Sequence, residues 1–329
     1  MLSEMKALTL HHSGIPYGPI AAPAVRISVF VPGDARVIAK DAGVAVGEYL
    51  ALIPPDAICA RLVGDEESDS GGEGSVWLEP FTARDMALLV QEYATAFDVA
   101  GTESHTVFLF PRQDFLATGF SLRTILDTNT TSFSPNWTNF IFFEVALNFA
   151  KEQPEELVGF ARALASRFPG ASVTCSTGFS YSLGVEPMLR DQINAKLLRF
   201  VGMDPCYDHL HYRLGSSVPF VAWLVYCNGS QMDQLGGVDM LRDRLGDQVV
   251  EPLAIGAMLR AANMPPLGDV NRGAPDIGVM PRLRRVLAPV LFDKASELRR
   301  FPEEMAERWL ARFDSRPDQP WQNAELIPY

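Results

Sequence analysis

The stretch between residues 223 and 272 constrains the fold most, because its apolar spacing changes from strand-like to helical and back again. A continuous apolar run over 220–226 predicts a strand, and the Asn228-Gly229 pair that follows is typical of a turn. Ser230 is then placed to cap a helix. The apolar residues of this helix recur at helical spacing and are Leu235, Val238, Leu241 and Leu245.

Two short strands are expected next, around 249–253 and 255–259, followed by a proline-rich connection from Pro265 to Arg272. Upstream, the strand expected over 173–183 alternates apolar residues with Ser and Thr, which predicts one buried and one solvated face. Strand-helix-strand passages separated by a helix predict an α+β fold. We expect an antiparallel or mixed β-sheet with helices packed mainly on one face.

The first half of the chain has strands and helices of its own. A strand is predicted over 25–31, and Thr82 is placed to cap an amphipathic helix. The polar stretch over 127–132 is typical of a linker. We therefore predict two subdomains: an N-terminal α/β subdomain over 1–130 with an acidic loop at 64–75, and a C-terminal α+β domain over 131–329.

Part of the C-terminal domain resembles a bacterial family. The Gly236-Gly237 pair before Leu241, the run through Gly256, and Leu267-Gly268-Asp269-Val270-Asn271 followed by Arg272 are similar to type VI secretion immunity proteins. These proteins are associated with immunity to VRR-type and other restriction-endonuclease-like nuclease effectors. The resemblance implies a small cytoplasmic protein, encoded beside a toxin, that protects the producing cell by binding that toxin. It transfers no catalytic residue.

The net charge of −12 disfavours nucleic acid as a direct partner, because phosphate binding needs a basic face. A basic protein is the better candidate. Five carboxylates lie close together in the serine- and glycine-rich loop and are Asp65, Glu66, Glu67, Asp69 and Glu73. One hypothesis is an acidic arm that imitates the DNA backbone for a nuclease and speeds association. The alternative is a solvated loop between two strands.

The best candidate for chemistry is a group of potential metal ligands formed by Asp204, Asp208, His209 and His211. The pattern lacks the two-part ligand spacing of a recognised zinc site. Cys206 lies near His209, but nothing in the sequence orients such a base. We therefore predict no catalytic residue, no metal and no cofactor, with a metal-dependent hydrolase at this group as the alternative.

Asp269 and Asn271 lie in the connection that follows two prolines. Both residue types form local turns and bond neighbouring backbone, which predicts a structural role for this loop. The alternative is direct contact with the toxin. Asp269 and Asn271 therefore join the five loop carboxylates as candidate partner-binding residues.

The sequence as a whole predicts an immunity protein that binds a type VI effector and occludes its active site. The expected effector is a nuclease encoded by the adjacent gene, and an effector-loading adaptor is a further alternative. The chain lacks a signal-peptide pattern and any apolar run near 18 residues, which predicts a cytoplasmic protein without direct nucleic-acid or membrane partners. A homo-oligomer remains an option.

Overall fold

Strand β1 (Ala21–Val31) lies between two strands from much later in the chain, β6 (Asn139–Ala146) and β7 (Ser172–Tyr181). The computed structural model describes residues 8–11, 18–64, 76–99, 101–111, 117–128, 136–181, 186–205, 208–272, 275–292, 294 and 302–314. Within them the strands form one ten-stranded sheet in the order β3-β2-β4-β5-β6-β1-β7-β8-β10-β9. Every pairing in this order is antiparallel.

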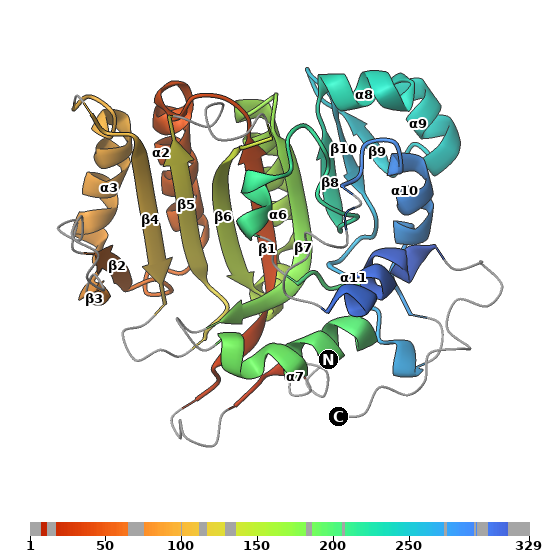
Figure 1. The fold of residues 1–329 in the computed structure, drawn as a ribbon, viewed down its shortest axis with the longest axis horizontal. Coiled ribbons are helices and arrows are strands. Elements are labelled where there is room, and N and C mark those ends of the chain that lie inside the picture. Colours follow the sequence, from red (N-terminus) through yellow and green to blue (C-terminus); the bar gives the residue numbers. More distant parts are fainter. Residues whose placement is uncertain are drawn as a thin grey trace.

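The predicted α+β class is confirmed (Figure 1). The other strands of the sheet are β2 (Ala60–Gly64), β3 (Val76–Pro80), β4 (Ser104–Phe110), β5 (Ser121–Asp127), β8 (Leu224–Cys227), β9 (Val250–Pro252) and β10 (Ala257–Arg260). The α-helices of the described residues are α2 (Ala35–Leu52), α3 (Ala83–Thr95), α5 (Leu147–Glu152), α6 (Pro154–Arg167), α7 (Glu186–Arg199), α8 (Gly229–Leu235), α9 (Gly237–Leu245), α10 (Met280–Leu287) and α11 (Glu303–Leu310). Short 3-10 helices are η1 (Asp208–Tyr212), η2 (Val270–Arg272) and η4 (Ala311–Phe313).

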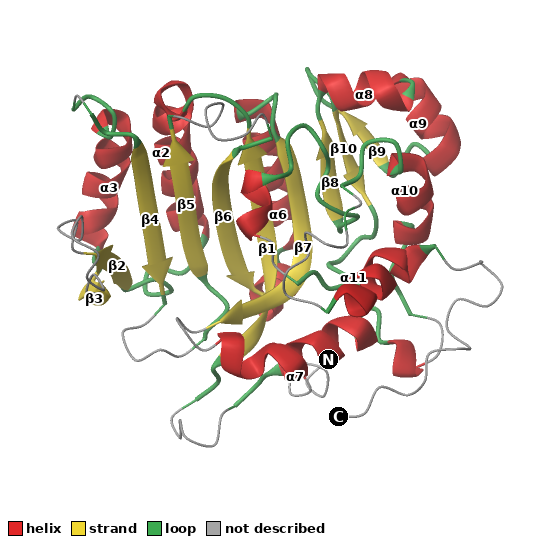
Figure 2. Cartoon of the chain, viewed as in Figure 1, coloured by secondary structure: helices red, strands yellow, loops and turns green. Residues whose placement is uncertain are grey.

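Helices α2, α3 and α6 cover one face of the sheet, which we call the helical face (Figure 2). Tyr49 of α2 packs 4.9 Å from the ring of Phe143, and Phe160 of α6 packs 5.1 Å from the same ring. Tyr93 of α3 bonds the hydroxyl of Thr124 on β5. Side chains alternate along each strand, so the residues between these positions lie on the opposite face, which we call the outer face.

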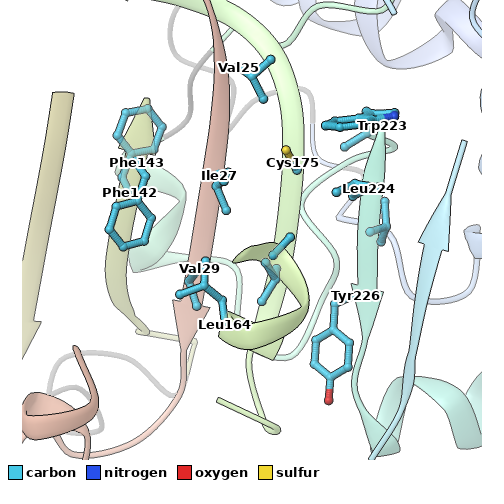
Figure 3. Packing of buried hydrophobic residues seen from close by; sticks show 14 of the residues in the cluster. Val25, Ile27, Val29, Phe142, Phe143, Leu164, Cys175, Trp223, Leu224 and Tyr226 are labelled. Carbon is cyan, nitrogen blue, oxygen red and sulfur yellow. The ribbon is translucent and has the colours of Figure 1, made fainter. Parts of the chain in front are cut away.

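The core is continuous across the middle of the sheet. Phe143, Ile27, Cys175 and Leu224 are aligned by the register of four neighbouring strands and form one buried row on the helical face (Figure 3). Leu164 of α6 is also fully buried there. Because this row joins strands from both predicted subdomains, a boundary near residue 130 would fall within one sheet. The two-subdomain division stays a prediction.

Local sequence signals explain several helix ends. Thr82 and Asp85 form a capping box at the start of α3, as the sequence indicated for Thr82. Pro154 occupies the first turn of α6, where its missing N–H costs nothing. Strand β6 ends at Ala146, and the residues that follow it directly form the short helix α5.

The structure differs in two ways from the single helix that the sequence predicts with Ser230 as its cap. Asn228 is its N-cap, and the Asn228 side chain accepts a hydrogen bond from the Gln231 N–H at 3.1 Å. The helix is also divided at Gly236, whose φ of +86° lies in the left-handed region that favours glycine. The apolar spacing through 245 therefore describes two consecutive short helices, α8 and α9.

The prediction of a solvated face on β7 was wrong. All ten residues of β7 are buried, including its Ser and Thr side chains. Hydrogen bonds compensate for the burial of two of these hydroxyls: Ser172 donates to the Ser217 carbonyl at 2.9 Å, and Ser176 donates to the Asp204 carboxylate. Alternation of polar and apolar residues identified the strand, but the polar side faces other parts of the protein.

A buried ion pair lies next to these hydroxyls on the outer face. Arg26 of β1 is fully buried, and its Nε is 3.0 Å from Glu144 Oε1 on β6. Ser121 donates to the other oxygen of Glu144 at 2.6 Å. The guanidinium lies against Gly178, where an added Cβ would be 2.8 Å from Arg26 Cδ. The centre of the sheet therefore contains a hydrogen-bonded polar layer.

Candidate partner-binding surfaces

The first candidate surface is the loop between β10 and α10, which contains Asp269 and Asn271. Arg199 at the end of α7 binds the Asp269 carboxylate through Nε and Nη2, both at 2.9 Å. The Asn271 N–H donates to the same carboxylate at 3.1 Å. Asp269 is 8 % exposed, whereas Asn271 is partly exposed. Asp269 thus holds the loop in place, in line with the structural role expected from the sequence.

Backbone hydrogen bonds hold the same loop against the segment after α7. The Val201 N–H donates to the Gly268 carbonyl at 3.1 Å, and the Gly202 N–H donates to the Leu267 carbonyl at 2.9 Å. Gly268 has a φ of +70°, and an added Cβ would meet Ile277 at 2.4 Å. Only glycine fits there without displacement. Backbone contacts and the conformation of Gly268 therefore fix the position of residues 267 and 268.

A cavity of about 680 Å³ opens beside this loop. Its lining combines apolar side chains, prolines and a few polar groups: Lys151, Ala262, Asn263, Met264, Pro265, Pro266, Leu267, Gly268, Asp269, Pro275, Asp276 and Gly278. Met264 is 39 % exposed, and Asp276 is also exposed. The cavity gives this side of the protein a recess bordered by two carboxylates and an amine.

Two of the four potential metal ligands, Asp204 and His211, are engaged in other contacts. Asp204 is buried and accepts a hydrogen bond from Ser176, and its backbone carbonyl accepts one from Arg26 at 3.4 Å. The buried ring of His211 stacks on Phe140, with the ring centres 5.9 Å apart. Among the residues that the structure describes, no three His, Cys, Asp or Glu side chains are grouped as metal ligands. Cys206 and the side chains of Asp208 and His209 lie outside that description.

An aromatic cluster lies over the outer face beside η1. Tyr212 is 40 % exposed and meets Trp137 edge to face at 4.4 Å, and Tyr212 is also 3.7 Å from the ring of His211. Thr138 donates its N–H to the His211 carbonyl at 2.7 Å, which joins the two segments. No pattern in the sequence singles out Tyr212, because only the fold brings it beside Trp137.

The acidic loop itself, with Asp65, Glu66, Glu67, Asp69 and Glu73, lies outside the described residues. Its neighbours in the chain are placed: β2 and β3 pair antiparallel and form one end of the sheet (Figure 1). Residues 55–128, which supply β2 to β5 and α3, contain 13 Asp and Glu against four Lys and Arg. Residues 55–128 therefore contribute −9 to the total net charge of −12.

The comparisons with known proteins identify the class of protein to which this chain belongs. The sequence profile of the family described as "Type VI immunity for VRR-NUC" matches residues 113–313, more than half of the chain. The chain belongs to this type VI immunity family. Its family role is that of a non-enzymatic inhibitor directed at an effector.

One solved structure with a similar fold is the Pseudomonas aeruginosa T6SS protein PA0821. The two share 16 % sequence identity with a TM-score of 0.73, over 97 % of this chain and 91 % of that one. At this identity the similarity concerns the fold. No curated protein matches the chain significantly. Over the part of the chain that the structure describes, no helix is both long enough and apolar enough to span a membrane.

Proposed function

We propose that this protein neutralises a nuclease effector encoded by the adjacent gene by covering the cleft in which that nuclease binds DNA. The observation that carries the proposal is the match to the immunity family for VRR-NUC. The concentration of negative charge within residues 55–128 of the sequence supports it. A nuclease needs a basic groove for the phosphate backbone, and an acidic protein surface competes for that groove.

The acidic loop between β2 and β3 is the main contact in this proposal. Asp65, Glu66, Glu67, Asp69 and Glu73 offer five carboxylates within nine residues, a density comparable to that of backbone phosphates. Attached to an end of the sheet, they attract a basic partner over a distance set by ionic strength. Their principal effect is on the association rate.

The loop with Asp269 and Asn271 forms a second, smaller contact in the proposal. The ion pair with Arg199 occupies the Asp269 carboxylate, so Asp269 acts by holding the loop in place. The partly exposed Asn271 is the residue that faces a partner. Protection against a nuclease requires the inhibitor in the compartment that holds the DNA. We accordingly place the protein in the cytoplasm.

The proposed function is tested by co-purification of the protein with the product of the adjacent gene, followed by a DNA-cleavage assay of that product. We expect a stable complex and loss of cleavage at equimolar protein. A product that cuts DNA equally well in the presence of excess protein would refute the proposal. Purified immunity protein is also expected to cut no DNA by itself.

The role of the acidic loop needs a matched pair of variants. In the first, the five loop carboxylates are changed to their amides. In the second, five exposed carboxylates at the other end of the molecule are changed in the same way: Asp233, Asp239, Asp243, Asp247 and Glu307. We expect only the first to slow association about tenfold or more at low salt and to flatten its salt dependence. Equal association rates for both variants would exclude steering by the loop.

A further inference from the structure

The recess beside the loop after β10 is built from two distant parts of the chain. One wall is the loop itself, residues 262–269 and 275–278, and the other includes Lys151 in the last turn of α5. The volume of about 680 Å³ lies within the range of about 300 to 1,000 Å³ that is typical of ligand sites. The recess is therefore large enough to receive side chains of a partner.

Hydrogen bonds to carbonyl groups attach the loop wall of the recess to the sheet. The Ala262 carbonyl accepts hydrogen bonds from Trp223 Nε1 at 2.7 Å and from Arg260 Nε at 3.1 Å. The Thr177 hydroxyl of β7 donates to the Pro266 carbonyl at 3.0 Å. Attachment at these two points lowers the conformational entropy that the loop loses when a partner enters the recess.

The loop wall offers an apolar contact. Met264, Pro265 and Pro266 line the recess, and Met264 is 39 % exposed. A methionine side chain is flexible and polarisable, so it adapts to the shape of an apolar group placed against it. An apolar side chain that enters the recess is removed from water together with Met264, which favours binding.

The recess also has two charged groups that no internal contact neutralises. Lys151 is half-buried and Asp276 is exposed, and both line the recess. Within the described part of the chain, neither side chain has a hydrogen bond or an ion pair. Asp269, the other carboxylate of the recess, is already bound by Arg199. One amine and one carboxylate are therefore available to a partner.

These charges restrict the kind of partner that fits. A buried charge is costly unless the partner supplies the opposite charge, so the occupant needs an acidic group for Lys151 and a basic group for Asp276. A nucleic acid strand is a poor fit, because its phosphates would approach Asp276 and Asp269. A protein segment can supply an acidic, a basic and an apolar side chain together. The recess therefore has the chemistry of a site for a protein segment.

We propose that the recess receives a protruding loop of the effector, which places an apolar side chain on Met264, an acidic one against Lys151 and a basic one against Asp276. This inference rests on the proposed function and specifies what the effector contributes to the second contact. Apolar contacts in a pocket of the interface mainly slow dissociation, whereas the acidic loop mainly speeds association. The two contacts therefore have separable kinetic effects.

The test uses two matched pairs of variants and measures binding to an inactivated form of the adjacent gene's product. Met264→Asp is paired with Met240→Asp, because Met240 on α9 is 41 % exposed and lies outside the recess. Asp276→Lys is paired with Asp233→Lys, a change of an exposed carboxylate on α8. We expect the recess variants to raise the Kd about tenfold or more through faster dissociation, and the controls to change it less than about twofold.

Asp276→Lys keeps the test independent of stability, since exposed Asp276 has no side-chain contact to lose within the described residues. Thermal unfolding verifies that each variant is folded. If folded Met264→Asp and Asp276→Lys proteins bind as tightly as the unsubstituted protein, the recess is not a contact, and the proposed function stands. If the unsubstituted protein fails to bind, the proposed function and this inference are both overturned.

Photocrosslinking identifies the segment that enters the recess. With p-benzoylphenylalanine in place of Met264, irradiation of the complex is expected to link the protein to the effector, whereas the same group in place of Met240 should give no link. Mass spectrometry then locates the linked effector peptide. We expect that peptide to contain an acidic and a basic residue next to an apolar one. A linked peptide without both charges would overturn the assigned contacts to Lys151 and Asp276.

Discussion

Arg199 and Asp269 form a two-bond ion pair that joins the end of α7 to the loop after β10, with side chains only 9 % and 6 % exposed. Removing one partner of a buried pair leaves the other charge buried without compensation, which costs about 3 to 5 kcal/mol. We expect Asp269→Asn to lower the free energy of unfolding in urea by about 3 kcal/mol.

Asp276→Asn is the control for this prediction, because Asp276 is an exposed carboxylate of the same loop. Its effect on the free energy of unfolding is expected to stay within about 0.5 kcal/mol. Equal losses in the two variants would show that the Arg199 pair contributes nothing specific.

The contact between Gly178 and Arg26 gives a second prediction. An added Cβ at Gly178 would be 2.8 Å from both Cδ and Nη1 of Arg26, and the guanidinium is held by Glu144. Gly178→Ala is expected to destabilise the protein by about 1 to 3 kcal/mol through overpacking. In Gly159→Ala, the new Cβ on α6 meets nothing within 4 Å, so the higher helix propensity of alanine should stabilise the protein. Thermal unfolding measures the stability of both variants. Loss of stability in Gly159→Ala alone would contradict the expected overpacking at Gly178.

The N-cap of α8 gives a third prediction. Asn228 accepts from the Gln231 N–H, and its Nδ2 donates to the Gly170 carbonyl at 3.1 Å. Asn228→Ala should therefore cost about 1 to 2 kcal/mol in urea denaturation. Ser230→Ala should cost less, because exposed Ser230 only donates to the Asn228 side chain. A larger loss of stability in Ser230→Ala than in Asn228→Ala would identify Ser230 as the N-cap.

His105 on β4 makes stability depend on pH. Burial lowers the pKa of His105 below its ordinary value of about 6.5, while the nearby Glu92 carboxylate acts in the opposite direction. The neutral ring packs edge to face on Tyr93 at 4.9 Å. The stabilising contribution is complete above the pKa of the unfolded state and is lost as pH falls through the lower folded-state pKa.

Urea denaturation between pH 7 and pH 5 tests this dependence. We expect the unsubstituted protein to lose more stability over this range than His105→Gln, which cannot titrate there. Parallel loss of stability in the two proteins would assign the pH dependence to other groups.

Much of the secondary structure was predictable, because its causes are local. The apolar period of α3 and the capping residue Thr82 identified that helix, and the alternation in β7 identified that strand but wrongly predicted a solvated face. The division at Gly236 was missed because Leu235, Val238 and Leu241 keep a helical spacing across it. Among the candidate site residues, the bond from the Asn271 N–H to Asp269 was predictable because Asx turn chemistry is local, whereas the partner-binding role of both residues stays a prediction.

The sequence by itself determined the α+β class, the excess of negative charge and, through its family pattern, the immunity role. The tertiary structure decided which strands are neighbours, since β1 pairs with β6 and β7 through hydrogen bonds that form between segments far apart in the chain. It also decided that the hydroxyl side of β7 is buried, because Asp204 and Ser217 arrive there from later segments. Pairing and burial depend on the free energy of such long-range contacts, which no local pattern of residues encodes.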